Sequence, residues 1–163
     1  MTLHVKPLAN VGVEVSGFDI NRELDPATRD ALVRLWDEHA ILLFRGQGIT
    51  PEEQVAFSRH FGPLELHPLK ATTSAEYPEL FTLENDPEKD KYNLAYYHGQ
   101  AIVGRLDWHI DLHYTGKPNR GALLRAVVCA SEDGMTGFGD LAKAWDALDA
   151  DTQLLLEKLE VSY

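Results

Sequence analysis

Two strongly marked helix starts lie in the first third of this sequence and restrict how it can fold. Asp25-Pro26 combines a residue type preferred at the N-cap with a proline at the first helical position, and apolar residues at helical spacing extend the predicted helix to about His39. Thr50-Pro51-Glu52-Glu53 is a capping box, and it predicts a second helix that ends before Gly62-Pro63. The fold must therefore accommodate two helices within this short stretch.

Strand signals alternate with these helices. Residues 3–20 predict two short strands, because their valines alternate with small or polar residues. Residues 40–44 are a compact apolar run typical of a buried strand, and residues 80–84 are a weaker candidate. The longest apolar run, residues 122–130, predicts a strand interrupted by Arg125.

The remaining sequence is less regular. Residues 92–105 lack clear periodicity, and we expect a functional loop within residues 62–106. Residues 140–148 and 149–159 predict two short helices, each with an aspartate at its start. Because no internal repeat or domain linker is visible, we expect a single domain over residues 1–163.

The composition excludes several classes of protein. The 163 residues are 44% hydrophobic and 25% charged, as in ordinary globular domains. A formal net charge of -11 argues against nucleic acid as a partner, because phosphate binding needs a basic surface. We expect a cytoplasmic protein without membrane contact, since no signal peptide or membrane-length apolar run is visible. Cys129 is the only cysteine, which excludes an intramolecular disulfide, and its apolar neighbours predict a buried thiol.

Trp108-His109-Ile110-Asp111 places an imidazole and a carboxylate two residues apart. In an extended strand such side chains lie on one side with Cα atoms about 6.6 Å apart, so His109 and Asp111 could converge on one metal ion. These ligand types, with a second histidine, form the metal site of non-haem Fe(II) oxygenases. On spacing alone, an ordinary pair of surface or turn residues is the commoner case. In a straight strand the Cα of His113 lies about 13 Å from that of His109, so we expect His113 to line a pocket rather than to bind the ion.

Six motifs, in the same order along the chain, resemble those of the Fe(II)/2-oxoglutarate dioxygenases of the taurine dioxygenase and chlorophenoxyacetate dioxygenase family. They are the Gly12–Asp19 segment (similar to G-x-x-V/I-x-G-x-D), the capped helix start at Ile49–Gln54 followed by Phe61-Gly62, Leu66-His67-Pro68, the W-H-x-D of Trp108–Asp111, Arg120–Leu124, and Asp133-Gly134-Met135-Thr136, in which Asp133 replaces the first glycine of a G-G-x-T loop. The chain therefore resembles the amino-terminal portion of this family over nearly all of its length.

The resemblance implies an α+β protein with the double-stranded β-helix, or jelly-roll, fold, with the carboxy-terminal part of that pattern absent from this chain. It also implies that His109 and Asp111 bind Fe(II), that Thr136 hydrogen-bonds a 2-oxoglutarate carboxylate and that His67 contributes to the substrate pocket. Trp108 is expected to pack behind the iron-binding strand.

By the same resemblance, the protein is an Fe(II)- and 2-oxoglutarate-dependent dioxygenase. It would hydroxylate a small anionic organic substrate, such as a sulfonate or an aryloxy acid, with O₂ as oxidant and succinate and CO₂ as co-products. Small molecules are the expected partners, with a homo-oligomer left open.

The sequence contains no counterpart of the family's second iron-binding histidine or of its 2-oxoglutarate-binding arginine. We therefore expect this polypeptide alone to bind Fe(II) weakly and to turn over 2-oxoglutarate negligibly. Two alternatives stay open, namely a catalytically incompetent fragment of such an enzyme and a small metal-binding module that uses His109, Asp111 and His113.

Overall fold

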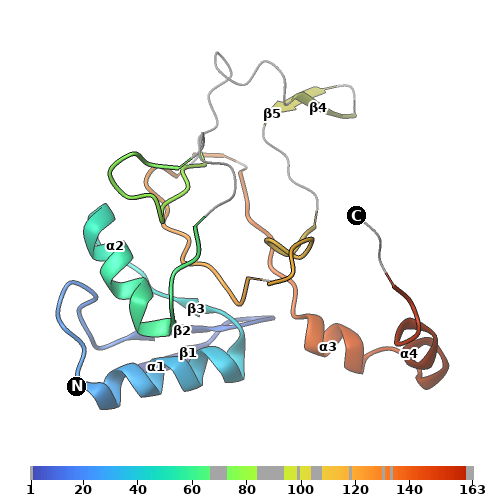
Figure 1. Cartoon of the computed structure of the whole chain (residues 1–163), viewed down its shortest axis with the longest axis horizontal. Helices are drawn as coiled ribbons and strands as arrows, with labels where there is room; N and C mark the ends of the chain where they lie inside the picture. The colour runs from blue at the N-terminus through green and yellow to red at the C-terminus, as the bar shows by residue number, and fades with distance from the viewer. Residues whose placement is uncertain are drawn as a thin grey trace. The chain divides into compact units, whose positions relative to one another are not determined.

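The computed structural model describes residues 2–66, 73–83, 94–98, 100–103, 108–117, 119–129, 131–132 and 134–160. The chain divides into two compact units, the first formed by Met1–Phe61 with Leu124–Tyr163 and the second by Gly62–Leu123 (Figure 1). The first unit is therefore discontinuous along the chain. The single domain expected over residues 1–163 stays a prediction.

A three-stranded sheet with the order β1-β2-β3 lies in the first unit. β1 (His4–Pro7) pairs antiparallel with β2 (Val13–Ser16), and β2 pairs parallel with β3 (Leu42–Leu43). A parallel pair needs a crossover connection, which α1 (Pro26–His39) supplies. The two strands predicted within residues 3–20 are confirmed, and the strand predicted at residues 40–44 is present in a shorter form.

Both predicted helix starts are confirmed. The Asp25 carboxylate accepts hydrogen bonds from the Thr28 N–H at 2.9 Å and from the Thr28 hydroxyl at 2.7 Å, which caps α1. In α2 (Pro51–Ser58) the Glu53 N–H donates to the Thr50 hydroxyl oxygen at 3.2 Å, and the Thr50 N–H donates to the Glu53 carboxylate at 2.7 Å. These bonds satisfy N–H groups that a helix leaves unpaired in its first turn.

The core of the first unit is built by β2, α1, α2 and the chain that connects them. Its buried apolar side chains are Val13, Val15, Ile20, Leu24, Leu32, Val55 and Phe57. Phe57 is the aromatic centre, with its ring centroid 5.6 Å from that of Phe44 and 5.4 Å from that of Phe61. Burying one such side chain stabilises a fold by about 1.5–3 kcal/mol, so this cluster holds α2 against Phe44, the residue directly after β3.

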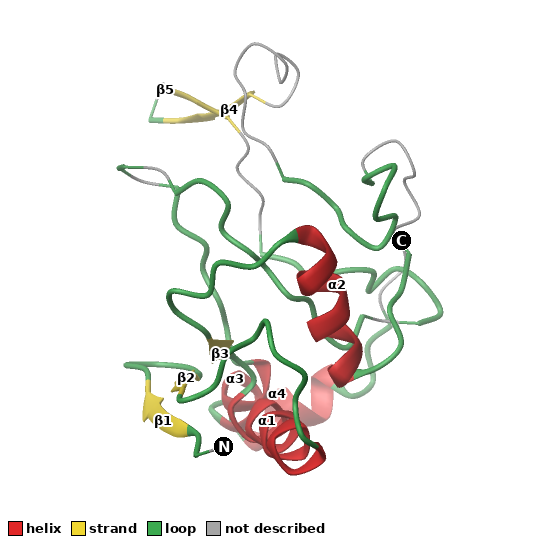
Figure 2. Ribbon diagram, turned by 90° about the vertical axis from the view of Figure 1, so that its left-hand side faces the viewer, coloured by secondary structure: helices red, strands yellow, loops and turns green. Residues whose placement is uncertain are grey.

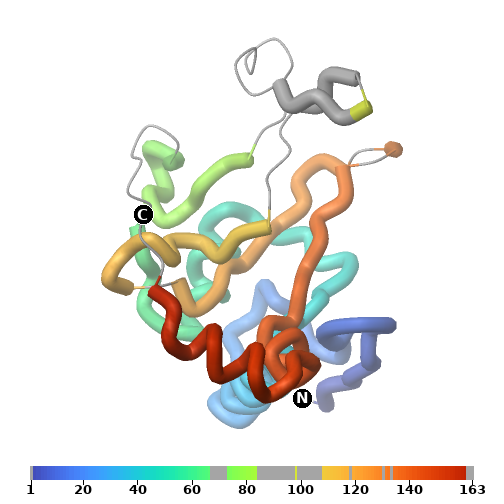
Figure 3. The backbone as a smooth tube through the Cα atoms, turned by 90° about the vertical axis from the view of Figure 1, so that its right-hand side faces the viewer, coloured from blue at the N-terminus to red at the C-terminus, as the bar shows by residue number. Residues whose placement is uncertain are grey.

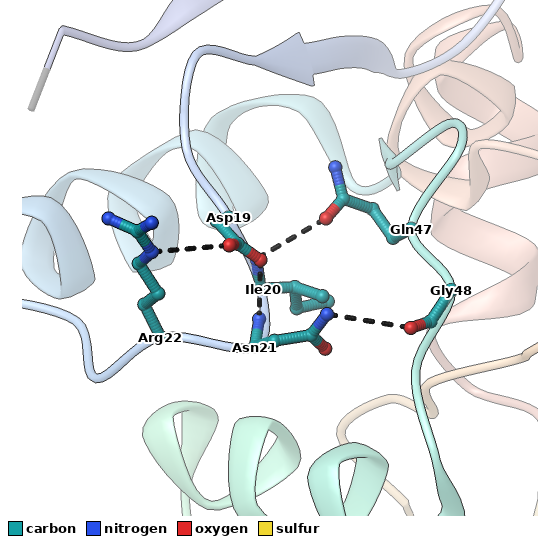
Figure 4. Close-up of polar contacts among 6 residues, drawn as sticks. All are labelled: Asp19, Ile20, Asn21, Arg22, Gln47 and Gly48. Carbon is teal, nitrogen blue, oxygen red and sulfur yellow. Dashed lines mark hydrogen bonds and ion pairs between the residues drawn. The ribbon is translucent and has the colours of Figure 1, made fainter.

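Hydrogen bonds join the loop before α1 to the loop before α2. Figure 4 shows the six residues of this connection, which are Asp19, Ile20, Asn21, Arg22, Gln47 and Gly48. The Ile20 N–H donates to the Gln47 side-chain oxygen at 3.3 Å, and the Asn21 side chain donates to the Gly48 carbonyl at 3.4 Å. The Asp19 carboxylate accepts from the Asn21 N–H at 3.0 Å. The two loops are therefore held together beside the buried Ile20.

Two short helices follow in the carboxy-terminal part of the first unit. α3 (Leu141–Asp146) is capped by Asp140 and α4 (Ala150–Leu156) by Asp149, and each carboxylate accepts the N–H of the residue three positions later. The two predicted helices are confirmed with shorter bounds. No helix in the described parts of the chain is long and apolar enough to cross a membrane.

The strand predicted at residues 122–130 is wrong for the part of that run that the structure describes. Residues 121–126 have no regular secondary structure and a bend follows at Val127-Val128, so this stretch is drawn as loop in Figure 2. A strand exists only when a neighbour accepts and donates its backbone hydrogen bonds, and the described residues supply no such neighbour here. For the same reason Cys129, predicted to be buried, is exposed.

The second unit contains a hairpin where an irregular stretch was predicted. β4 (Leu94–Tyr97) pairs antiparallel with β5 (Gln100–Val103), and Tyr97 faces Gln100 across a two-residue connection. His98, the first residue of that connection, has a positive φ of 49°. The His98-Gly99 dipeptide between two apolar runs was the available sequence signal. At residues 80–84, the described part holds one isolated bridge, from Phe81 to Thr73.

Candidate metal centre

His109 and Asp111 lie in the second unit on a loop that leads into a turn. His109 and Ile110 have no regular secondary structure, and the turn begins at Asp111. The strand predicted for this motif is therefore wrong in the described residues. Leu112 adopts a positive φ of 57°, which L-residues rarely adopt, and this reverses the chain directly after Asp111.

The two side chains of the pair nevertheless meet. The His109 Nε2 lies 3.2 Å from the Asp111 Oδ1. The side chains are 46% and 57% exposed, respectively. Even with a protonated histidine, a pair this exposed contributes little to stability, about 0–1 kcal/mol. Exposure also leaves the pair accessible to a ligand.

The geometry of the pair fits two neighbouring positions of an octahedral metal ion. Two ligand atoms that each lie about 2.1 Å from such an ion, at right angles to one another, are about 3 Å apart. The observed 3.2 Å between Nε2 and Oδ1 is close to this separation. Imidazole nitrogen with carboxylate oxygen is also the donor set of non-haem Fe(II) sites. The separation and chemistry of the two donor atoms are therefore compatible with such an ion.

Hydrogen bonds within the following turn support the backbone of the pair. The Leu112 carbonyl accepts the Thr115 N–H at 3.0 Å and the Thr115 hydroxyl at 2.8 Å. The Asp111 carbonyl accepts the Asn119 N–H at 3.4 Å. No sequence pattern singled out Leu112 or Thr115, because a turn closed by a leucine with positive φ has no compositional signature.

His113 does not join the pair. Its Nδ1 lies 2.5 Å from the Ile110 carbonyl, and its ring packs edge-on against Tyr114 at 5.7 Å. Among the described residues, no group of three histidine, cysteine or acidic side chains could hold a metal ion. The three-ligand module with His113 gains no support from this arrangement. Trp108, expected to pack behind the pair, is exposed instead.

The other two predicted site residues are not brought to the pair by the described contacts. Thr136 lies on an exposed loop of the first unit, after Gly134 with its φ of 64°. Its role toward 2-oxoglutarate stays a prediction. His67, predicted for the substrate pocket, lies outside the described residues.

Comparison with known proteins assigns the chain to a family. The family model described as "Taurine catabolism dioxygenase TauD, TfdA family" matches residues 4–163. An (S)-phenoxypropionate/alpha-ketoglutarate-dioxygenase of Sphingobium herbicidovorans is 34% identical over 160 residues, covering 98% of this chain and 52% of that protein. The alpha-ketoglutarate-dependent 2,4-dichlorophenoxyacetate dioxygenase of Cupriavidus pinatubonensis is 34% identical over 163 residues, covering 96% and 55%.

A solved structure agrees with this assignment. The crystal structure of a taurine dioxygenase from Burkholderia xenovorans matches with a TM-score of 0.62 at 25% identity, covering 96% of this chain and 51% of that one. The chain belongs to the TauD/TfdA family, and it shares the fold of the matching part of these dioxygenases. It spans about half the length of the curated relatives that it matches.

Proposed function

We propose that this chain carries the iron-binding pair of an Fe(II)- and 2-oxoglutarate-dependent dioxygenase that hydroxylates small anionic organic substrates. The observation that supports this most directly is the 3.2 Å approach of the His109 Nε2 to the Asp111 carboxylate, in a chain that its family model matches from residue 4 to residue 163. A jelly-roll domain completed beyond the described elements belongs to the same proposal.

Each site residue has a defined part in the proposal. His109 would hold the ion through Nε2, and Asp111 would hold it through a carboxylate oxygen that also offsets part of its charge. When bound, the iron supplies the oxidising chemistry with O₂, as 2-oxoglutarate is converted to succinate and CO₂. The Thr136 hydroxyl would donate a hydrogen bond to a 2-oxoglutarate carboxylate, and His67 would donate one to the anionic head group of the substrate.

The names of the relatives support an anionic substrate. Those relatives are named for phenoxypropionate, 2,4-dichlorophenoxyacetate, sulfonates and sulfate esters. All four classes pair a small organic body with a carboxylate, sulfonate or sulfate group. A cationic or histidine donor in the pocket would therefore be the shared requirement, and His67 is the proposed donor.

Metal binding by the 163-residue chain tests the proposal without requiring turnover. We expect Mn(II), used as a stable probe of the Fe(II) site and followed by electron paramagnetic resonance, to bind the wild-type chain weakly but measurably. Asp111→Asn keeps the shape of the side chain but removes its charge, so we expect at least about a tenfold loss of affinity. His109→Ala should give a loss at least as large.

Asp151→Asn provides the matched control. Asp151 lies in the exposed first turn of α4 and carries the same charge as Asp111, so its substitution should leave Mn(II) affinity unchanged. Equal affinity in the Asp111→Asn and Asp151→Asn variants would contradict the proposed site.

A further inference from the structure

The hydroxyl group of Thr115 lies at the centre of the turn that follows the His109 and Asp111 pair. Its oxygen lies 2.8 Å from the Leu112 carbonyl oxygen and 2.8 Å from the Lys117 carbonyl oxygen, and it accepts the Lys117 N–H at 3.2 Å. The Thr115 N–H donates to the same Leu112 carbonyl at 3.0 Å. Figure 3 draws this stretch in gold, bending back on itself. One side chain therefore connects the two ends of the turn.

Leu112 needs this support because its backbone is strained. Its φ is 57°, in the left-handed region that is sterically unfavourable for a residue with a Cβ atom. Such a conformation persists only where the surrounding structure over-determines it. In the part of the chain that the structure describes, both hydrogen bonds to the Leu112 carbonyl come from Thr115. Without the hydroxyl group, the strained residue would keep one of these bonds.

The same turn fixes the backbone on either side of Asp111. The Asp111 carbonyl accepts the Asn119 N–H at 3.4 Å, and the Ile110 carbonyl oxygen lies 2.5 Å from the His113 Nδ1. Both contacts depend on the reversal of the chain at Leu112, which brings later residues back to this stretch. A different φ at Leu112 would therefore release the backbone of Asp111 from both contacts.

We propose that Thr115 is a positioning residue, whose hydroxyl group keeps the Asp111 carboxylate within reach of the His109 Nε2 so that both bind one metal ion. Removing a group that orients a metal ligand typically lowers metal affinity by about 10–100-fold. Thr115 itself does not bind the ion, since its hydroxyl group is engaged by backbone carbonyls. The inference deepens the proposed function and rests on it, because it concerns the same metal site.

Thr115→Val tests the proposal, because valine keeps the β-branched shape of the side chain and lacks the hydroxyl group. In the metal-free 163-residue chain, nuclear magnetic resonance should show a weaker Overhauser effect between the amide and α protons of Leu112, which are closest when φ is positive. Mn(II), followed by electron paramagnetic resonance, should bind this variant at least about tenfold more weakly than the wild-type chain. Thr115→Ser keeps the hydroxyl group and should restore both the Overhauser effect and the Mn(II) affinity.

Thr152→Val is the matched control. The Thr152 hydroxyl donates to the Asp149 carboxylate at 2.8 Å, at the start of α4, so this variant also loses a hydroxyl group that bonds within its own turn. Its Mn(II) affinity should equal that of the wild-type chain. All variants are compared well below their Tm, so that a difference in folded fraction does not alter the affinity. A purely structural role of Thr115 predicts a lower Tm with unchanged Mn(II) affinity.

The outcomes separate this inference from the proposed function. Wild-type affinity in Thr115→Val, beside a loss in Asp111→Asn, would overturn the inference and leave the proposed function standing. Wild-type affinity in Asp111→Asn would overturn the proposed function, and the positioning role with it. Equal losses in Thr115→Val and Thr115→Ser, or an unchanged Overhauser effect at Leu112 in Thr115→Val, would show that the hydroxyl group does not set the turn.

Discussion

Ala40 ends α1 in a conformation that alanine rarely adopts. Its φ is 63° and its ψ is -33°, and the Ile41 N–H donates to the His39 carbonyl at 2.7 Å across it. This is a γ-turn with positive φ, a rare and strained conformation for a residue with a Cβ atom. Residues held in such regions cost about 1–3 kcal/mol. The strained residue lies where α1 passes into β3, and the pairing of β3 with β2 keeps the residue in this conformation.

Replacing Ala40 with glycine should relieve that strain. We expect Ala40→Gly to raise the free energy of unfolding by about 1 kcal/mol, measured by urea denaturation. Ala31→Gly makes the same chemical change inside α1, where it should lower stability by about 0.5–1 kcal/mol. Changes of the same sign in both variants would show that Ala40 is not strained.

The cap of α1 should make this helix sensitive to acid. The hydrogen bonds from the Thr28 hydroxyl and then from the Thr28 N–H lower the pKa of Asp25 below its ordinary value. The stabilisation is therefore complete above the unfolded pKa of about 3.9 and is lost as the pH falls through the lower folded value. We expect the Thr28 amide resonance to titrate in that acidic range.

Asp25→Asn serves as the control for this titration. Asparagine is an N-cap acceptor at any pH, so the Thr28 resonance should then stay constant between pH 5 and 2. A wild-type midpoint at or above the ordinary aspartate pKa would contradict the assigned cause.

Among the elements, the close approach of β2 and β3 depends on Gly12. Gly12 has a φ of 86°, and a Cβ atom there would lie 2.7 Å from the Ile41 Cβ and 2.8 Å from the Ile41 carbonyl oxygen. The Val13 N–H bonds that same carbonyl at 2.9 Å. The first family motif therefore begins with a glycine because a Cβ atom at this position would collide with Ile41.

Substitution at Gly12 should therefore disrupt the sheet. We expect Gly12→Ala to lower the free energy of unfolding by about 2 kcal/mol or more, since positive φ and backbone contact act together. Gly48→Ala should stay within about 0.5 kcal/mol of wild type, because nothing lies within 4 Å of a Cβ atom there. Thermal or urea unfolding of both variants decides between this account and a merely flexible glycine.

Capped helices were predictable from sequence because their determinants are local. The Asp25, Thr50, Asp140 and Asp149 caps each bond an N–H three residues away, so the sequence window contains both partners. A strand was predicted at residues 122–130 and is absent from the described part of that run, whereas no strand was predicted at residues 94–103, where a hairpin is present. Both predictions were wrong because a strand forms only beside a neighbouring strand. The first run has apolar residues without a described partner, whereas the second acquires one through a two-residue turn.

For the whole molecule, the sequence motif predicted the two proposed ligands but not their setting. A two-residue spacing brings His109 and Asp111 together in a strand and, as observed, also in a loop closed by Leu112 and Thr115. The positions of Thr136 and His67 relative to the pair depend on long-range packing, which no local pattern encodes.

The proposed pair supplies two of the six positions of an octahedral ion. We therefore expect the 163-residue chain alone to form succinate from 2-oxoglutarate negligibly under anaerobic loading with Fe(II) followed by O₂. A chimera in which residues 1–163 are followed by the unmatched part of the Sphingobium relative should form succinate. In that chimera Asp111→Asn should abolish the activity, while Asp151→Asn should retain it. Rapid succinate formation by the chain alone would show that other residues complete the site.

The bond from Arg125 to the Ile49 carbonyl has a consequence for the order of folding. It joins residues 76 positions apart, and the intervening second unit is in effect an insertion within the first. The buried apolar side chains of the described residues all lie within residues 13–57, so we expect this core to form once that stretch has left the ribosome. The segment that carries Arg125 must then close a long loop, at an entropic cost that grows with the logarithm of the loop length. Pulse-labelling of nascent chains should accordingly find β2, α1 and α2 protected well before Arg125 docks.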